Sequence, residues 1–180
     1  MEFKEIKKTL TQYAKYVIQQ SRSNLTKGKH NSTKELYRSL GFELDQEKNA
    51  FLLEFLMEDY GAFQDKGVSG IKSSYTRKGT SVFNKNFKYG SGTGKKGGLT
   101  KGIDKWLRSK KFQWRNKKTG RFMSYQSMRY IIVRSIYNKG LRQTLFFSNP
   151  FNKGLQKYGN ELVNAFALDL ENSLMLGTKK

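Results

Sequence analysis

The sequence predicts an α+β fold in which helices near both ends of the chain pack on a small antiparallel sheet. Two observations support this fold class. Apolar residues recur at helical spacing in residues 3–18 and again in 150–176. Between them, apolar and polar residues alternate with a period of two in residues 36–44 and 50–58, which is typical of half-buried strands. The predicted sheet consists of a hairpin plus one crossing strand.

The first third of the chain contains a helix, a loop and the hairpin. One side of the helix is apolar, with Phe3, Ile6, Leu10, Tyr13, Ala14, Val17 and Ile18. Residues 21–34 are polar and predict a loop. The strands at 36–44 and 50–58 are joined by a polar turn of about five residues, and this arrangement predicts a hairpin. A short ordered corner is expected at 60–67.

The middle of the chain predicts a long excursion followed by two helices. Residues 68–98 are rich in Gly, Ser, Thr and Lys. A short helix is predicted at 99–111, with Ile103, Trp106 and Leu107 on one side, and a turn at 116–120. A second helix is expected at 124–138, burying Met128, Ile131, Ile132 and Ile136, and Gly140 suits its C-cap.

The last part of the chain predicts an extended crossing and a long final helix. The crossing covers residues 141–150 and includes Leu145, Phe146 and Phe147. Pro150 suits the start of the final helix, because proline is tolerated in a first helical turn. That helix runs to about Leu176, and its predicted apolar face carries Leu155, Tyr158, Leu162, Val163, Phe166, Ala167, Leu170 and Leu174.

The composition limits the class of protein. A chain of 180 residues predicts one domain, residues 1–180. It contains no cysteine, which excludes disulfides and thiolate metal sites, and its only histidine is His30. The N-terminal residues show no apolar signal region, and no stretch approaches the ~18 apolar residues of a membrane span. We therefore expect the protein to act in a cytoplasm or in a particle assembled there.

The positive charge is concentrated in one segment. The net charge is +21, and residues 66–123 hold 17 basic side chains against one acid, Asp104. We predict a basic Gly-rich insertion arm at 68–123, with partner or DNA contacts at Lys95, Lys96, Lys101, Arg108, Lys110, Lys111, Arg115, Lys117, Lys118 and Arg121. Its predicted assembly aromatics are Phe83, Phe87, Trp106 and Trp114. Cations among aromatics suit nucleic acid, but an acidic protein partner and a solvated face remain open.

Patterns typical of catalysis are weak, and the sequence predicts a non-enzymatic protein with no cofactor and no metal. Residues 92–97 match the letters G-x-G-x-x-G, but no βαβ unit surrounds them. Glu54, Glu58, Asp59 and Asp65 are candidate metal ligands of a nuclease, although the two glutamates fit the polar face of a hairpin. We keep a standalone nucleic-acid-binding protein as the alternative to a structural role.

The order of elements resembles the neck and tail-completion proteins of tailed bacteriophages, the head–tail joining family. Four segments carry this resemblance. They are the entry into the hairpin at Asn31–Leu40, the corner Tyr60–Gly67, the helix segment Ile103–Leu107, and the helix with its crossing at Ile132–Phe147. In the corner, Gln64-Asp65 stands where the family has an apolar residue followed by an acid, and the basic insertion is long.

The resemblance implies a non-catalytic virion protein at the junction of portal and tail, assembled in the host cytoplasm. It implies a homo-oligomeric ring that docks between portal, adaptor or tail proteins. Rings form when one surface of a subunit meets a different surface of the next and the rotation closes. The basic insertion is then expected to meet either DNA in the channel or an acidic ring protein.

Overall fold

The computed structural model describes residues 3–28, 33–47, 50–72, 76–77, 80–81, 89 and 98–177. The chain forms two compact units. Unit 1 comprises residues 1–61 and 145–180, and unit 2 comprises residues 62–144. The predicted α+β class is confirmed, since helices and antiparallel strand pairs are both present. The division into units does not test the prediction of one domain, which stays a prediction.

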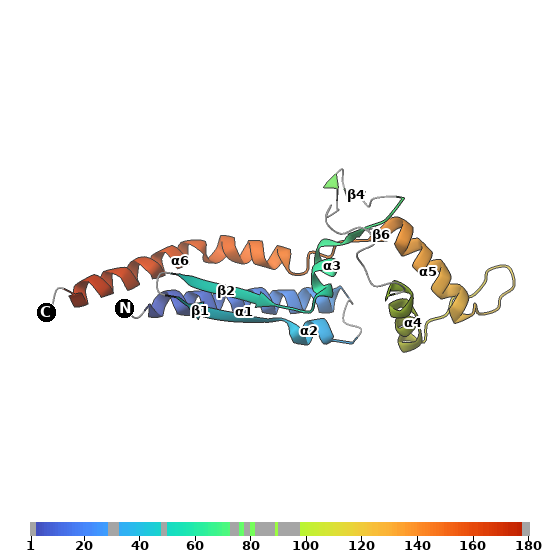
Figure 1. The fold of residues 1–180 in the computed structure, drawn as a ribbon, viewed down its shortest axis with the longest axis horizontal. Helices are drawn as coiled ribbons and strands as arrows, with labels where there is room; N and C mark the ends of the chain where they lie inside the picture. Colours follow the sequence, from blue (N-terminus) through green and yellow to red (C-terminus); the bar gives the residue numbers. More distant parts are fainter. Residues whose placement is uncertain are drawn as a thin grey trace. The chain divides into compact units, whose positions relative to one another are not determined.

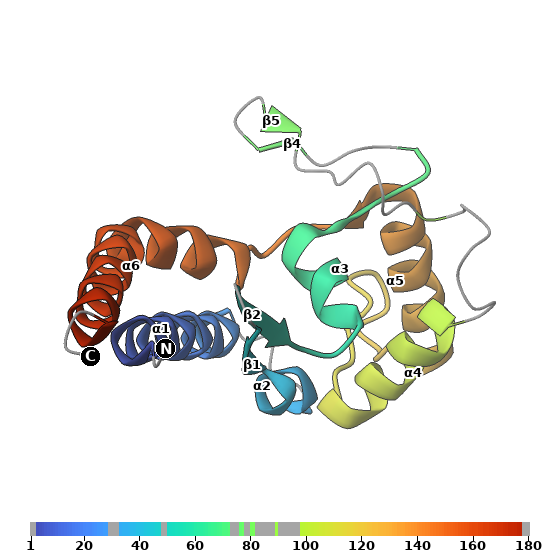
Figure 2. The ribbon, with the colours of Figure 1, turned by 60° about the vertical axis from the view of Figure 1, so that its left-hand side comes forward.

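In its described residues, unit 1 is built from helices and a hairpin (Figures 1 and 2). Its elements are α1 (Lys4–Lys27), α2 (Glu35–Ser39), β1 (Gly41–Gln46), β2 (Phe51–Leu56) and α6 (Ser148–Gly177). Helices α1 and α6 run side by side in opposite directions, so that the start of α1 lies beside the last part of α6. The hairpin packs along α1, where the ring of Phe3 meets that of Phe51.

Tyr13 fixes the contact between α1 and α6. Its hydroxyl donates a hydrogen bond to the backbone oxygen of Phe151 at 3.3 Å, and its ring packs against those of Phe55 and Tyr158. A Cβ at Gly154 would stand 2.7 Å from the Tyr13 ring. The absence of a side chain at Gly154 is therefore what admits the Tyr13 ring between the two helices.

The core of unit 1 lies where α1 meets α2 and the chain entering α6. Ile18, Leu25, Leu36, Leu40 and Phe146 form one buried apolar cluster. Phe55 and Phe147 pack around this cluster with their rings 5.3 Å apart. Burying side chains of this size contributes about 1.5–3 kcal/mol each relative to leaving them in water.

The predicted hairpin is confirmed as an antiparallel pair of β1 and β2. Its register places Phe42 opposite Phe55 and Leu44 opposite Leu53, and these four side chains are half-buried on the inner side. The alternate residues are exposed on the outer side. The register therefore follows from the period of two in the sequence.

In its described residues, unit 2 holds the remaining strands and further helices. Its elements are β3 (Val68–Ser69), β4 (Thr76–Arg77), β5 (Thr80–Ser81), α4 (Gly98–Lys110), α5 (Tyr125–Lys139) and β6 (Gly140–Leu141), while α3 (Tyr60–Lys66) begins in unit 1 and ends in unit 2. Strand β3 pairs with β6 and β4 with β5, both antiparallel. Helices α4 and α5 pack against each other, and Leu107 of α4 and Met128 of α5 are fully buried.

Gly140 ends α5 as predicted and starts β6. Its φ of 86° is disfavoured for residues with a side chain, and its N–H bonds to the oxygen of Ile136. A Cβ at this position would stand 2.6 Å from the backbone nitrogen of Gly70. At the other end of α5, the Ser124 side chain accepts the N–H of Ser127 as an N-cap.

Two predictions about the first third of the chain are wrong. The loop expected at 21–34 is helical up to Lys27, because buried Ser21 and Leu25 continue the face of Ile18. The strand expected from Leu36 begins only at Gly41, because Glu35–Ser39 is α2. Leu36 and Leu40 are both buried, and a spacing of four fits one face of a helix as well as one face of a strand. Arg38, which a strand would place on the same face, is exposed.

The crossing and the helix faces also differ from expectation. Of the crossing expected at 141–150, only Leu141 belongs to a strand, β6, and this strand pairs with β3 rather than with the hairpin. Ile131 was expected to be buried in α5 but is exposed. In α6 the predicted start near Pro150 is confirmed, whereas most of the predicted apolar face is exposed.

Candidate functional site

The chain between α4 and α5 forms a small ordered hairpin, residues 112–123, here called the basic hairpin. Arg115 and Phe122 form an antiparallel bridge, and the N–H of Met123 bonds to the oxygen of Trp114 at 2.8 Å. The predicted turn at 116–120 is confirmed, with the Asn116 side chain accepting the N–H of Lys118 at 2.9 Å. Gly120 completes the turn at a φ of 68°.

The basic hairpin is anchored on its own unit by α5. The N–H of Trp114 points to the sulfur of Met128 at 3.3 Å, and Met128 of α5 is fully buried. The amide of Gln113 donates to the oxygen of Met123 at 3.3 Å. The base of the hairpin is therefore fixed, and its tip presents the charged residues to solvent.

The structure places the predicted basic residues in two groups. Lys101, Arg108 and Lys110 are exposed on α4, and Lys111 follows that helix at a φ of 49°. Arg115, Lys117, Lys118 and Arg121 are exposed on the basic hairpin, and the described residues provide them with no carboxylate partner. The predicted residues Lys95, Lys96, Phe83 and Phe87 lie outside the described residues.

The two tryptophans belong to an exposed aromatic row. Trp106 of α4 lies 6.4 Å from Phe112, and Phe112 lies 5.8 Å from Trp114, between ring centroids. Phe122 is the most exposed of these rings, at 63%, and the Arg115 guanidinium lies over it at 5.2 Å. Trp106 and Trp114 were predicted from the sequence as assembly aromatics, but Phe122 was not included among them.

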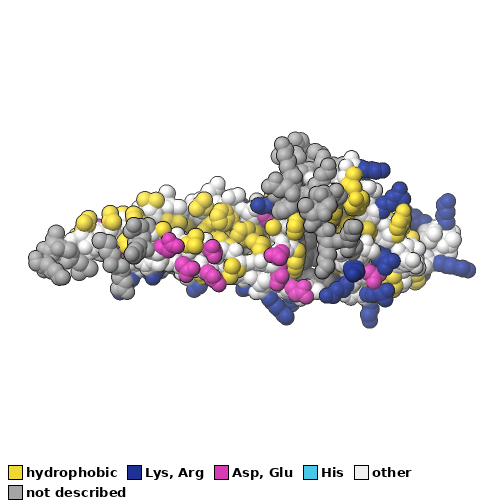
Figure 3. Space-filling model, in the orientation of Figure 1, with side chains coloured by type: hydrophobic (Ala, Val, Ile, Leu, Met, Phe, Trp, Pro, Cys, Tyr) yellow, Lys and Arg dark blue, Asp and Glu magenta, His cyan; other side chains and the backbone are white. Residues whose placement is uncertain are grey.

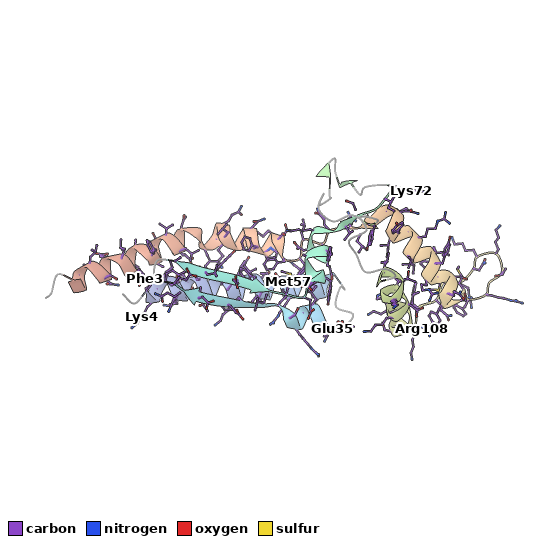
Figure 4. All side chains as sticks on the ribbon, viewed as in Figure 1. Phe3, Lys4, Glu35, Met57, Lys72 and Arg108 are labelled. Carbon is purple, nitrogen blue, oxygen red and sulfur yellow. The ribbon has the colours of Figure 1, made fainter. Side chains whose placement is uncertain are left out.

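Asp104 joins the two helices that carry the basic hairpin. Its carboxylate accepts from Arg108 of α4 at 2.9 Å and from Arg129 of α5 at 3.2 Å. The hydrogen bond from Arg108, supported by the charges of both guanidiniums, holds the pKa of Asp104 below its ordinary value. Arg108, labelled in Figure 4, therefore has a structural partner among the predicted contact residues.

The outer side of the β1–β2 hairpin is acidic and apolar. We call it the acidic face, and it comprises the exposed residues Glu43, Asp45, Leu52, Glu54 and Leu56. Glu43 and Glu54 stand directly opposite each other in the strand register. Like charges in this position destabilise a strand pair, and the described residues provide neither carboxylate with a cation. Figure 3 shows acidic side chains gathered over this hairpin.

Helix α6 has a buried side and an exposed apolar side. The side that packs on α1 carries Gly154, Ala165 and Asp169, all buried. The second side is exposed, and we call it the α6 stripe: Leu155, Val163, Phe166, Leu170 and Leu174. Val163 is 69% exposed and Leu174 is 64% exposed. Hydrophobic side chains along this helix are visible on the surface in Figure 3.

An open groove of about 840 Å³ lies beside α1, α2 and the start of β1. Arg22 lines it, with its guanidinium bonded to the backbone oxygens of Tyr37 at 3.1 Å and Leu40 at 2.8 Å. This cation therefore holds the turn into β1.

The nuclease candidates do not form a metal site in the described part of the chain. No group of three or more His, Asp or Glu side chains that could hold a metal ion occurs among those residues. Glu54 lies on the acidic face, and Asp65 is buried near the end of α3. His30 lies outside the described residues.

No family model, curated protein or solved structure matches the chain. Among the residues that the structure describes, no helix is long and apolar enough to cross a membrane.

Proposed function

We propose that this chain is a structural virion protein of a tailed bacteriophage, which oligomerises into part of the neck or tail-completion ring between portal and tail proteins. The α6 stripe is the observation that carries the proposal. A helix with apolar residues on two sides is suited to packing between two partners. Helix α1 covers one side of α6, and a neighbouring subunit would cover the other.

The size of the α6 stripe supports association. Its five large apolar residues follow one another along α6 from Leu155 to Leu174. Exposed apolar side chains gathered along one helix are typical of interaction sites on soluble proteins. Burial would contribute roughly 25 cal/mol for each Å² of apolar area removed from water.

The placement in a phage neck derives from the sequence resemblance. Two of the segments that carry it include ordered elements of the structure. The segment Tyr60–Gly67 contains α3, and the segment Ile132–Phe147 contains the end of α5 and β6. A subunit with several distinct exposed surfaces suits a ring, because each copy can contact its two neighbours with different surfaces.

The mass of the assembled protein tests this proposal. We expect the purified chain to form a defined oligomer by light scattering and native mass spectrometry, alone or on addition of portal or tail proteins. Val163→Asp with Leu170→Asp should reduce the assembly to single chains of 20.9 kDa. Asn160→Asp with Asn164→Asp adds the same charge to exposed positions of the same helix and should assemble normally. A wild type that stays monomeric and binds no virion protein would exclude the proposal.

A standalone nucleic-acid-binding protein is the second candidate, and the basic hairpin favours it. Its exposed cations and aromatic rings can neutralise phosphates and stack on bases. On this hypothesis, Gln at Lys110, Lys111, Lys117 and Lys118 should weaken DNA binding and flatten its dependence on salt.

Matched substitutions make the nucleic-acid test specific. Gln at the exposed α1 residues Lys7, Lys8, Lys15 and Lys27 removes the same charge from another surface. Fluorescence anisotropy with a labelled duplex and a labelled single strand would compare the two variants over a salt series. Equal binding by both would rule out the basic hairpin as the nucleic-acid site.

A further inference from the structure

We propose that the basic hairpin of one copy docks on the acidic face of a second copy of this chain. This inference rests on the proposed function, because it names a contact between neighbouring subunits of the ring. It differs from packing through the α6 stripe, which involves another surface of unit 1.

The two surfaces match in charge. The basic hairpin carries four exposed cations, Arg115, Lys117, Lys118 and Arg121, and lacks acidic residues. The acidic face carries Glu43, Asp45 and Glu54, with Glu47 and Glu58 exposed at its ends. Neither set has an ion pair with the described part of the chain. Docking would pair both sets at once.

The acidic face is destabilised without a cation. Glu43 and Glu54 oppose each other across β1 and β2, and directly opposed like charges weaken a strand pair. A Lys or Arg side chain placed between these carboxylates would replace their repulsion with attraction to a shared cation. The sheet therefore gains stability from a basic partner, and the chain itself supplies one in every copy.

The two surfaces also match in apolar character. Leu52 and Leu56 are exposed beside the acidic residues, and Phe122 and Trp114 are exposed beside the basic ones. Protein interfaces concentrate aromatic and Arg side chains at their centre, with polar residues around them. Phe122 and the Arg115 guanidinium that lies over its ring provide both residue types at one place on an ordered hairpin.

The distribution of charge between the two units favours a second copy as the partner. The basic hairpin belongs to unit 2 and the acidic face to unit 1, so that each copy offers both halves of the contact. Unit 2 holds 21 of the 35 basic side chains but only two of the 14 acidic ones. A contact between unlike surfaces repeats from copy to copy, which is the requirement for a ring.

Charge reversal of each surface provides the test. Variant A carries Lys117→Glu, Lys118→Glu and Arg121→Glu; variant B carries Glu43→Lys, Asp45→Lys and Glu54→Lys. We expect each to lose the assembled mass of the wild type, because like charges then meet at every contact. The control Lys7→Glu, Lys15→Glu and Lys27→Glu, on exposed α1 positions, should assemble as the wild type does.

Mixing identifies the contact itself. In an equimolar mixture, the acidified hairpin of variant A meets the basic face of variant B, and the native hairpin of B meets the native face of A. We expect the mixture to regain the assembled mass, with both variants in equal amounts by native mass spectrometry. Combining all six substitutions in one chain should restore assembly as well. Circular dichroism melting of A and B checks that each chain is folded.

The outcomes separate the inference from the proposed function. A wild type that is monomeric under all conditions would overturn both. A wild type that assembles, together with variants A and B that assemble equally well, would overturn only this contact. If variant A assembles but no longer binds a labelled DNA, the basic hairpin serves nucleic acid and the inference is wrong. The inference is also wrong if variants A and B both lose assembly and their equimolar mixture does not regain it.

Discussion

Asp169 of α6 caps the start of α1 by accepting the backbone N–H of Ile6 at 2.9 Å. The same carboxylate accepts the N–H of Glu5 at 3.2 Å. Phe3, the residue before α1, provides no side-chain cap of its own. A carboxylate 163 residues away in the chain therefore satisfies two donors that a helix leaves unpaired at its N-terminus. This contact fixes the register of α6 against α1.

Removal of this cap should destabilise unit 1. Asp169 is only 3% exposed, so Asp169→Ala leaves two backbone donors without their acceptor in a partly buried place. We expect a loss of about 1–3 kcal/mol in the free energy of unfolding, measured with urea. Asp169→Asn, which keeps one acceptor oxygen, should lose less.

A neighbouring acid controls for charge in this experiment. Glu171 is exposed on the same helix, and Glu171→Ala should change the stability by less than about 0.5 kcal/mol. Equal losses for Asp169→Ala and Glu171→Ala would show that the cap contributes nothing.

Two serines of unit 1 should respond to alanine in opposite directions. Ser21 is fully buried in α1, and its hydroxyl has no hydrogen-bond partner among the described residues. Ser39 donates to the oxygen of Leu36 at 3.1 Å and accepts the N–H of Glu58 at 3.1 Å. We expect Ser21→Ala to be neutral or stabilising, and Ser39→Ala to cost about 1 kcal/mol. Thermal melting of the two variants and the wild type measures both changes in stability. A clear loss of stability in Ser21→Ala would show that the Ser21 hydroxyl makes a stabilising hydrogen bond.

Short-range patterns predicted most of the elements and the pairing of the two hairpin strands. The period of two gave the inner residues Phe42, Leu44, Leu53 and Phe55 of the hairpin, because alternation specifies a face directly. The α5 N-cap at Ser124 and the C-cap at Gly140 occupy the positions that local backbone chemistry favours. The extension of α1 to Lys27 was missed because polar residues surround the buried Ser21 and Leu25.

The candidate site was predictable as a charged segment but not as a shape. The basic residues of the hairpin were visible in the sequence, and the Asn116–Gly120 turn was expected. Glu54 of the acidic face was interpreted as part of the polar side of a hairpin or as a metal ligand of a nuclease. Its opposition to Glu43 was not predicted, because that pairing depends on the register. Periodicity showed that α6 is apolar but could not show which side meets α1, because Tyr13 and Gly154 decide that contact across 141 residues.

Glycine should be required at position 140 but not at position 102. Gly140→Ala would place a Cβ 2.6 Å from the nitrogen of Gly70 at a positive φ, so that β3 and β6 must separate. We expect a loss above about 1 kcal/mol. Gly102 lies inside α4, where an added methyl group would have no atom within 4 Å, and Gly102→Ala should stabilise by about 0.5–1 kcal/mol. Urea unfolding of both variants tests the pair, and a stable Gly140→Ala would contradict the strand pairing.

The ion pairs of Asp104 should make the stability of unit 2 depend on pH in the acid range. Because the folded pKa of Asp104 lies below its ordinary value of 3.8, the stabilisation is complete above that pH and is lost as the pH falls through the folded value. Asp104→Asn should therefore melt below the wild type at pH 7, and the difference should shrink below pH 3.8. Glu161→Gln, which removes one exposed charge from α6, provides the control and should show no such convergence. A difference between Asp104→Asn and the wild type that stays constant down to the lowest pH at which both fold would show that the pairs with Arg108 and Arg129 do not stabilise the packing of α4 on α5.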